Sequence, residues 1–516
     1  NEILYGGAGD DTMVGGPGND IYRYTAREFN NDTITDFATS GDKIDLSFLN
    51  VADFATLSRF ISQDSFGNAV IRLGFDSNSE SITLKGVSKA SLSSANFIFN
   101  TNAAALTVEG TNYSDVIFGG NGNDTLYGYN GTDTLNGGAG NDILNAGSGN
   151  DTLIGGTGGD RMTGNDGNDT YYVDNTADVV IEATGEGVDT VFSSVNFAAG
   201  AQYIENITLT GSANINATGN GLANNLVGNA GSNVLNGGAG IDTMSGGVGS
   251  DSYYVDNAGD KVIETNVPGV DKVYASVSYS ISGQFIENLT LTGTGNINGT
   301  GNSLANIIAG NAGSNVINGG LGADTMSGGV GSDSYYVDNA GDKVIEANVP
   351  GVDKVYASVS YSISGQFIEN LTLTGTGNIN GTGNSLANII AGNAGSNVIN
   401  GGLGSDTLSG GAGADRFVFN TALGSANIDK ITDFNVPQDA IWLDNAVFTA
   451  LGATGLLAAS AFHVGAAAHD ANDRIVYNAA TGALFYDSNG SAAGGAVQFA
   501  TLAKGLAMSN ADFLII

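Results

Sequence analysis

The sequence predicts an all-β protein, a parallel β-roll or β-solenoid with β-rich capping regions. Three observations predict this fold. Glycine-rich nonapeptides follow one another in tandem, each carries Asp at its sixth position and a large apolar residue at its eighth, and a longer 82-residue unit recurs around them. The short stretch after each Asp is too brief for a helix, but it suffices for a minimal strand. Stacking such units buries a continuous core.

The longest unbroken run of nonapeptides extends over residues 110–172. Its sixth positions are Asp115, Asp124, Asp133, Asp142, Asp151, Asp160 and Asp169, and its eighth positions are Ile117, Leu126, Leu135, Leu144, Leu153, Met162 and Tyr171. If two nonapeptides make one full coil, alternate aspartates stack along the two edges of the roll. The eighth-position side chains then point inward, because side chains alternate along a strand.

The 82-residue unit gives the chain its larger organisation. Residues 239–320 and 321–402 differ at only three positions, and a looser copy occupies 157–238. Each copy also contains segments such as "DKVYASVSYSI" and "IENLTLTG", whose apolar alternation predicts strands.

These patterns predict a series of domains. We expect the end of a nonapeptide block at 1–23, a β-rich cap or linker at 24–100, a β-roll block at 101–172, three tandem 82-residue repeats (157–238, 239–320 and 321–402, within 157–402), last nonapeptide turns at 403–418, and a C-terminal cap at 419–516. The two caps share a motif, "DTITDFATSGDKIDL" at 32–46 and "DKITDFNVPQDAIWL" at 429–443.

Composition limits the possible partners. Lys and Arg total 16 against 52 Asp and Glu, so the formal net charge is −36. Such an anion repels nucleic acid and attracts cations. The chain has no Cys, which excludes disulfides and thiolate metal sites. The Ala/Gly-rich stretch 451–468 contains His463, and we expect no membrane span there.

The spacing of the aspartates calls for a cation. Carboxylates on successive coils lie about 5 Å apart and repel by roughly 3 kcal/mol at an effective dielectric near 20. Calcium accepts six to eight oxygen ligands in a flexible shell, whereas magnesium retains its waters in a tighter octahedron. Zinc and copper lack their preferred ligands, because only His463 and His469 are present. The sequence therefore predicts multiple bound Ca²⁺ ions.

The units "GGNGNDTLY", "GGAGNDILN" and "GGAGDDTMV" resemble the repeats-in-toxin (RTX, haemolysin-type) calcium-binding nonapeptide. The resemblance implies a parallel β-roll with calcium held between coils by the sixth-position Asp and turn carbonyls. The implied metal ligands are Asp11, Asp20, Asp115, Asp124, Asp133, Asp142, Asp151, Asp160, Asp169, Asp242, Asp251, Asp324, Asp333, Asp406 and Asp415. Asparagine takes this place at Asn224, Asn233, Asn306, Asn315, Asn388 and Asn397, where we expect a continuing solenoid with weak or absent calcium.

Two alternatives remain open for the acidic residues. Asn-Asp and Asp-Gly sequences favour turns without any metal, so the aspartates could serve as turn formers. In addition, Asp256, Asp260, Glu264 and Asp271 recur in each 82-residue copy and suggest an extra ion site in the linker.

The C-terminal region, 419–516, resembles the tail of type I-secreted RTX proteins, including serralysin-type proteases. Its end, Asp512 followed by "FLII", fits the acidic-then-apolar terminus of such secretion signals. The resemblance implies the type I secretion machinery as a partner and an extracellular or cell-surface location. The first residues, "NEILYGGAGDD", look like the tail of a nonapeptide, so we expect further sequence upstream.

No catalytic constellation is found in the sequence. It has no HExxH motif, no G-x-S-x-G elbow and no phosphate-binding loop, and His463 lies in an apolar stretch that favours packing. Three function classes follow. One is a calcium-stiffened structural or interaction solenoid (surface layer, adhesin or filament) that self-associates or binds cell-surface polysaccharide. The second is the secretion and folding module of a secreted protease, lipase or polysaccharide-modifying enzyme whose catalytic domain lies upstream. The third is a membrane-active toxin, which would need an apolar helical region upstream.

Overall fold

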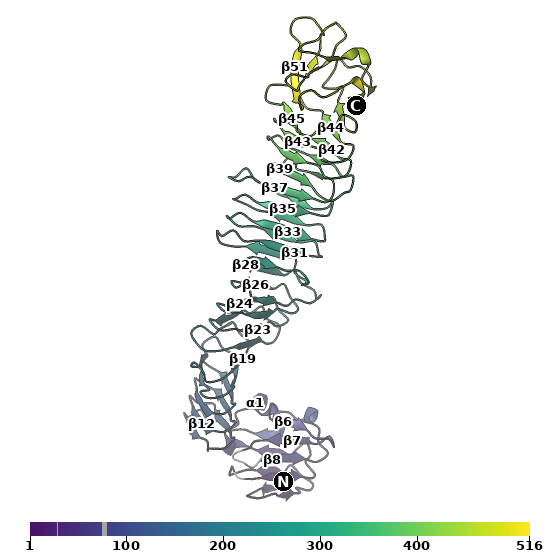
Figure 1. The fold of residues 1–516 in the computed structure, drawn as a ribbon. Coiled ribbons are helices and arrows are strands. Elements are labelled where there is room, and N and C mark those ends of the chain that lie inside the picture. The colour runs from purple at the N-terminus through teal and green to yellow at the C-terminus, as the bar shows by residue number, and fades with distance from the viewer. Residues whose placement is uncertain (28, 75–79) are drawn as a thin grey trace. The chain divides into compact units, whose positions relative to one another are not determined.

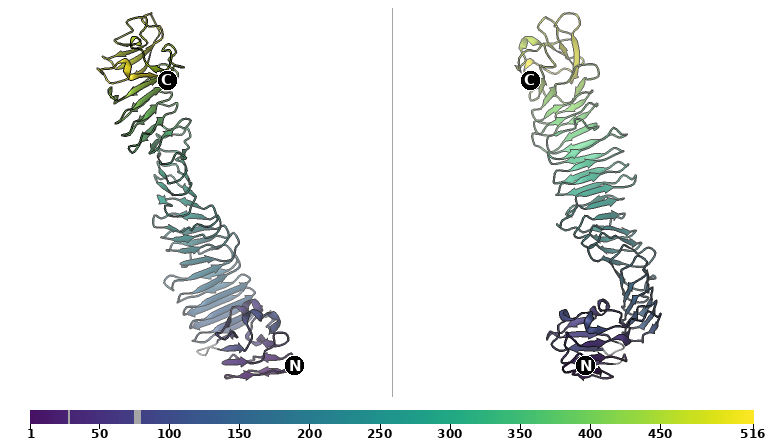
Figure 2. Two further views of the ribbon diagram at one scale, coloured as in Figure 1. Left: turned by 90° about the vertical axis from the view of Figure 1, so that its right-hand side faces the viewer. Right: turned by 180° about the vertical axis from the view of Figure 1, so that it is seen from behind.

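The computed structural model describes residues 1–27, 29–74 and 80–516, and its regular secondary structure consists almost entirely of short β-strands. It divides into two compact units, Asn1–Gly269 and Val270–Ile516. Within each unit the short strands stack like rungs (Figures 1 and 2). The predicted fold class, a parallel β-solenoid, is confirmed. Among the described residues, no helix is long and apolar enough to cross a membrane.

The first unit begins with a short two-sheet roll. One sheet is fully parallel and contains β1 (Ile3–Tyr5), β3 (Ile21–Arg23), β5 (Lys43–Asp45) and β9 (Phe97–Ile98). The other contains β2 (Thr12–Met13), β4 (Asn31–Ile34), β8 (Ser81–Leu84), β7 (Ala69–Arg72) and β6 (Ile61–Gln63), the last two pairing antiparallel. Short helices fill the connections: η1 (Ser47–Leu49), α1 (Phe54–Ser58), η2 (Lys89–Ser91) and η3 (Ser94–Asn96).

The main roll of the first unit alternates its strands between faces. Odd-numbered strands form one parallel sheet: β11 (Val116–Gly120), β13 (Thr134–Ala139), β15 (Thr152–Thr157), β17 (Thr170–Val173), β19 (Thr190–Ser193), β21 (Asn206–Leu209), β23 (Asn225–Val227), β25 (Thr243–Ser245) and β27 (Lys261–Val262). Even-numbered strands form two successive sheets: β10 (Thr107–Glu109), β12 (Thr125–Asn130), β14 (Ile143–Ser148), β16 (Arg161–Thr163) and β18 (Val179–Ile181), then β20 (Phe197–Ala198), β22 (Ala217–Asn220), β24 (Val234–Gly238) and β26 (Ser252–Val255).

The second unit continues the same pattern. One sheet contains β28 (Lys272–Ala275), β30 (Asn288–Leu291), β32 (Ile307–Ala309), β34 (Thr325–Ser327) and β36 (Lys343–Val344). Another contains β29 (Tyr279–Ser280), β31 (Gly299–Asn302), β33 (Val316–Gly320), β35 (Ser334–Val337), β37 (Lys354–Ala357), β39 (Asn370–Leu373), β41 (Ile389–Ala391), β43 (Thr407–Ser409) and β45 (Asp429–Ile431). A third contains β38 (Tyr361–Ser362), β40 (Gly381–Thr382), β42 (Val398–Asn400), β44 (Arg416–Phe419) and β46 (Ala440–Leu443).

The C-terminal cap closes both of the last two sheets. After β45 come β51 (Ala496–Thr501), β50 (Ala483–Asp487), β49 (Ile475–Asn478) and β48 (Phe462–Val464), and after β46 come β52 (Phe513–Ile515) and β47 (Gly455–Leu456). Helices η4 (Ala459–Ala461) and η5 (Asn510–Asp512) connect them. Strands β49, β50 and β51 form a three-stranded antiparallel meander. The last residues of the chain are therefore a strand paired in a sheet.

The register confirms that two nonapeptides make one coil. Thr134 pairs with Thr152 and Leu135 with Leu153, so each residue lies beside its equivalent two nonapeptides further on. All the eighth-position side chains from Ile117 to Tyr171 are 0% exposed and form the core. Burying each one contributes about 1.5–3 kcal/mol, which offsets the entropy lost by ordering so many glycines.

Each 82-residue copy spans nine strands, which is four and a half coils. Tyr171 lies in β17 and its equivalent Tyr253 lies nine strands further on, in β26, which belongs to the opposite face of the first unit. In the second unit, Tyr335 lies in β35, and its equivalent Phe417 lies in β44 of the other sheet.

The linker coils differ in length from the nonapeptide coils. The backbone N–H of Asp169 donates to Asp189, 20 residues on, and that of Asp189 donates to Glu205, 16 residues on. The strands keep their register through both coils, because Tyr171 pairs with Val191 and Val191 with Ile207. A long coil followed by a short one therefore preserves the stack.

The two caps use their shared motif in the same way. The carboxylate of Asp36 accepts hydrogen bonds from the backbone N–H groups of Gly15 and Gly16, and that of Asp433 accepts from Gly410 and Gly411. In each case the Asp of the shared motif satisfies the N–H groups of the first two glycines of the nonapeptide before the cap. That these regions close the ends of the repeat stack remains the prediction.

Glycine at the fourth position of a nonapeptide allows the coils to stack. At Gly149, with φ +142°, an added Cβ would overlap the Gly131 carbonyl oxygen of the preceding coil. At Gly9, with φ +107°, an added Cβ would meet no atom within 4 Å. The two glycines therefore share the left-handed backbone but differ in the contact between coils.

This pair supplies a matched test of stacking. We expect Gly9→Ala to cost about 1–2 kcal/mol through backbone strain alone, and Gly149→Ala to cost roughly 1–3 kcal/mol more through overpacking. Urea unfolding midpoints of both variants in saturating calcium would measure the difference. Equal losses would mean that the coils do not stack as closely as the structure has them.

Candidate metal centre

The sixth-position aspartates form two buried ladders along the roll. The backbone N–H of Asp115 donates to Oδ1 of Asp133 at 2.8 Å, and that of Asp133 donates to Oδ1 of Asp151 at 2.7 Å. Asp124 donates in the same way to Asp142. One oxygen of each carboxylate is therefore engaged by the coil before it, and the stacking predicted from the sequence is present.

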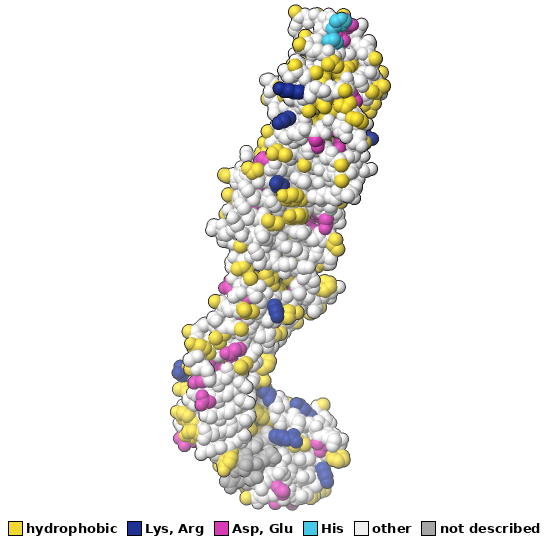
Figure 3. Space-filling model, in the orientation of Figure 1, with side chains coloured by type: hydrophobic (Ala, Val, Ile, Leu, Met, Phe, Trp, Pro, Cys, Tyr) yellow, Lys and Arg dark blue, Asp and Glu magenta, His cyan; other side chains and the backbone are white. Residues whose placement is uncertain are grey.

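The second carboxylate oxygen has no partner. Oδ2 is buried and lacks a hydrogen bond in Asp20, Asp124, Asp133, Asp142, Asp151, Asp160, Asp169, Asp242, Asp324, Asp333, Asp406 and Asp415. Buried polar atoms are almost always paired, so a regular series of such atoms is typical of a ligand-binding site. Few acidic side chains appear on the face drawn in Figure 3, because so many of them lie inside the roll.

Turn carbonyls converge on the same spaces. A Cβ placed on Gly119 would lie 2.6 Å from Asp124 Oδ2 and 2.6 Å from the carbonyl oxygen of Gly137 in the next coil. Gly128 lies in the same way against Asp133 Oδ2 and the Ala146 carbonyl. Each first-position glycine thus leaves a small space lined by a carboxylate and a carbonyl oxygen. These hard oxygen donors fit calcium, which would neutralise the ladder and join adjacent coils.

Burial makes the ladder unstable without a cation. Burial, with smaller contributions from neighbouring carboxylates, raises the pKa of Asp133, Asp160 and Asp169 to about 7. Burial also raises the pKa of Asp142 and Asp151 to about 6. In the described part of the chain, no Lys or Arg forms an ion pair with any of these groups.

Two of the predicted ligands are placed differently. Asp11 is half-exposed at the start of the chain, and its N–H donates to Asp32 of the cap. Oδ2 of Asp115 accepts hydrogen bonds from the N–H and hydroxyl of Thr111, which replaces the second glycine of that unit. Asp251 is placed like the other ladder aspartates: it is buried, and its Oδ1 accepts the backbone N–H of Asn233.

In the asparagine coils, a side-chain amide takes the place of the ladder carboxylate and makes hydrogen bonds. Nδ2 of Asn224 donates to the Ile204 carbonyl at 2.6 Å, and Nδ2 of Asn233 donates to the Ile215 carbonyl at 2.6 Å. Asn306 and Asn388 make the equivalent bonds to Ile286 and Ile368. The solenoid continues through these coils as predicted. A neutral amide supplies its own donor, so weak or absent calcium there remains the prediction.

Some acidic residues outside the nonapeptide motif continue the ladders. Asp160 donates its N–H to Asp178, Asp324 to Asp342, and Asp406 to Asp429. Their spacing from the preceding Asp is 18 residues in the first two cases and 23 in the third. Asp178 and Asp342 are the counterparts of Asp260, for which the sequence suggested an extra ion site, whereas Asp429 was not predicted as a ligand.

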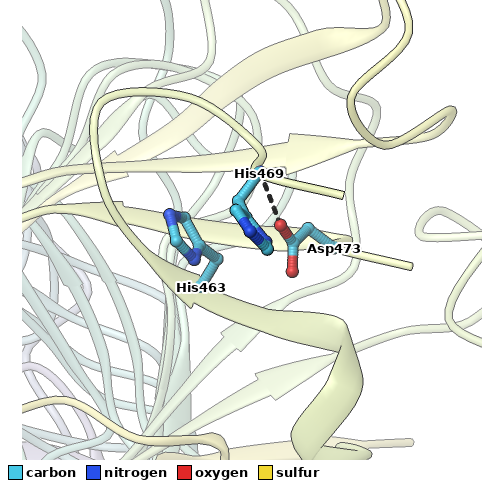
Figure 4. Close-up of side chains that lie close together, drawn as sticks. All are labelled: His463, His469 and Asp473. Carbon is cyan, nitrogen blue, oxygen red and sulfur yellow. Dashed lines mark hydrogen bonds between the residues drawn. The ribbon is translucent and has the colours of Figure 1, made fainter. Parts of the chain in front are cut away.

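The C-terminal cap brings together a second kind of cluster. His463 of β48, His469 and Asp473 could each offer one ligand atom, and these atoms lie within 4.8 Å of one another (Figure 4). The two imidazole rings stack with centroids 5.5 Å apart, and Oδ2 of Asp473 accepts the backbone N–H of His469. His463, for which the sequence favoured packing, is half-buried.

The parallel β-roll and its repeated sites, each formed by an aspartate carboxylate and a turn carbonyl oxygen, define a calcium-binding β-roll protein. The model of the RTX calcium-binding nonapeptide repeat matches residues 109–144, 145–180, 218–253, 300–335 and 382–417. The model of the peptidase M10 serralysin C terminal matches residues 1–118, not the 419–516 region in which the sequence suggested that likeness. No curated protein matches the chain. The chain belongs to the RTX type: it is a calcium-binding, secreted protein of the class exported by type I secretion.

Acid should stabilise the calcium-free roll. The folded chain holds protons on its ladder carboxylates up to pH about 6–7, whereas unfolded Asp loses its proton near 3.8. Between these limits the folded state binds more protons, so its stability rises as pH falls from about 7 to 4. Far-UV circular dichroism in chelator across this range should show a gain of β signal. A loss of β signal on acidification would contradict the buried, unpaired ladder.

A single amide should weaken calcium binding without breaking the ladder. Asp142→Asn keeps the Oδ1 acceptor for the Asp124 N–H but removes one charge. We expect the calcium concentration at the folding midpoint to rise by about three- to tenfold. Asp166→Asn, at an exposed position in the same block, is the control and should leave the midpoint unchanged. Equal midpoints for the two variants would assign Asp142 to turn formation.

Proposed function

We propose that this chain is an extracellular structural or interaction solenoid, of the surface-layer, adhesin or filament type, that calcium folds after type I export. The observation that carries the proposal is the tandem duplication of residues 239–320 and 321–402, which differ at only three positions. A length-building spacer gains from such duplication, because each added copy recreates the neighbours that the previous copy had.

The ladders supply a physical basis for export in an open state. Where calcium is scarce, buried carboxylates with raised pKa values oppose folding, and an unfolded chain can pass a secretion channel. At extracellular calcium levels, with dissociation constants of about 10⁻⁴–10⁻³ M for sites of that class, binding energy becomes folding energy. Type I secretion components are the partners that this route requires. Self-association and binding to cell-surface polysaccharide are the further partners that we propose for a surface role.

The function test begins with far-UV circular dichroism of this chain titrated with calcium, with magnesium and a chelator as controls. We expect a cooperative, calcium-selective and chelator-reversible gain of β signal. The same titration on a variant lacking 239–320 should give the same midpoint, because residue 238 then joins a nearly identical copy at 321. Sedimentation and electron microscopy in calcium would show whether the folded chain assembles. A folded, monodisperse chain that binds neither itself nor surface polysaccharide would contradict the structural role.

The match of residues 1–118 to a serralysin C-terminal model favours a second candidate. Under it, the chain is the secretion and folding module of a secreted protease, lipase or polysaccharide-modifying enzyme. An HExxH motif or a nucleophile elbow in upstream sequence, together with hydrolytic activity of the longer protein, would decide for this candidate. For the chain itself we propose a non-enzymatic role.

A further inference from the structure

The linker coil of an 82-residue copy brings together three carboxylates that no pair of nonapeptides supplies. In the first copy these are Asp169, the last nonapeptide Asp before the linker, Glu182, which follows β18, and Asp189, which precedes β19. One ligand atom from each lies within 4.8 Å of the others. The third copy repeats the arrangement with Asp333, Glu346 and Asp353.

These groups are buried and only partly satisfied. Asp169, Glu182 and Asp189 are 1%, 3% and 1% exposed. Asp189 Oδ1 accepts the N–H of Asp169, and Glu182 Oε1 accepts the hydroxyl of Tyr171. Asp169 Oδ2 and Glu182 Oε2 remain buried without a hydrogen bond, and so do Asp333 Oδ2 and Glu346 Oε2. Two unpartnered carboxylate oxygens from different segments thus occur in the cluster of the first copy, and the equivalent two occur in the cluster of the third copy.

The local sequence is specialised to build this cluster. The eighth-position residue is tyrosine at Tyr171 and Tyr335, whereas the unit directly before each has Met162 or Met326 at that position. The tyrosine hydroxyl donates a hydrogen bond to the glutamate, which methionine cannot do. The coil is 20 residues long, whereas a nonapeptide coil has 18. Gly164 forms the adjacent wall, because a Cβ there would collide with Asp169 Oδ2, Tyr171 Oη and Glu182 Oε1.

We propose that Asp169, Glu182 and Asp189 bind one calcium ion in the linker coil, and that Asp333, Glu346 and Asp353 bind another. Three converging carboxylates carry more negative charge than a hydrogen-bond network can compensate, and their oxygens are the ligands that calcium prefers. The ion joins the last nonapeptide coil to the linker coil, so the metal ladder extends beyond the nonapeptide motif. The sequence suggested an ion site among Asp256, Asp260, Glu264 and Asp271. The proposed cluster uses the equivalents of Glu264 and Asp271, together with the last nonapeptide Asp before them.

The alternative is a neutral glutamic acid hydrogen-bonded to tyrosine, with no ion. Glu182→Gln with Glu346→Gln distinguishes the two, because glutamine keeps the acceptor for the tyrosine hydroxyl and loses the charge. The matched control is Glu2→Gln with Glu109→Gln, which removes the same charge from exposed positions. Calcium bound per chain is counted by equilibrium dialysis and elemental analysis at saturating calcium, and circular dichroism verifies the fold.

The inference rests on calcium binding by the chain, and it predicts one calcium ion fewer for each linker site changed, with the control at the wild-type count. An unchanged count in the folded double variant would overturn it. If that variant fails to fold, crystals of the wild-type chain grown with calcium and soaked in terbium decide the matter. An anomalous peak among Asp169, Glu182 and Asp189 supports the site. Peaks at the nonapeptide ladders alone would overturn the inference and leave the calcium-folded solenoid intact.

Discussion

The structure depends on one repeated interaction, the acceptance of a backbone N–H by an aspartate carboxylate one coil further on. Oδ1 of Asp151 holds the N–H of Asp133, and Oδ1 of Asp133 holds that of Asp115. In the nonapeptide coils this bond joins residues 18 apart and places successive carboxylates in line. It engages only one oxygen of each carboxylate, and in most ladder aspartates Oδ2 is left buried without a partner. The same contact that orders the backbone therefore creates the charge problem that calcium solves.

Glycine is the second half of this arrangement. The first-position glycine leaves space for an oxygen-lined site, and the fourth-position glycine lets one turn approach the carbonyl oxygens of the preceding turn. Because glycine loses the most conformational freedom on folding, the apo chain is poorly ordered by its local preferences. Cation binding and the buried apolar column must supply the order together. The proposed coupling of folding to the extracellular ion would suit a protein that is exported before it folds.

The 82-residue copies modify this arrangement without interrupting it. Asparagine coils place amide hydrogen bonds where other coils have a carboxylate, and linker coils of 20 and 16 residues vary the length while preserving the stack. Because a copy spans four and a half coils, equivalent side chains of neighbouring copies in one unit face opposite sheets. A surface feature repeated in the sequence is therefore presented on both faces of the roll.

The sequence by itself determined the fold class, the coil length and the buried column from Ile117 to Tyr171. A period of nine with Asp and one apolar residue leaves few other ways to bury side chains and align charges. It also located the ladder candidates, because their phase is constant. Only the tertiary structure decided which carboxylate oxygens have hydrogen-bond partners. Oδ2 of Asp115 accepts the N–H of Thr111, whereas Oδ2 of Asp133 has no partner. Only the structure, too, brought Glu182 to Asp169 and His463 to Asp473, since these contacts depend on how coils of irregular length stack and not on any local spacing.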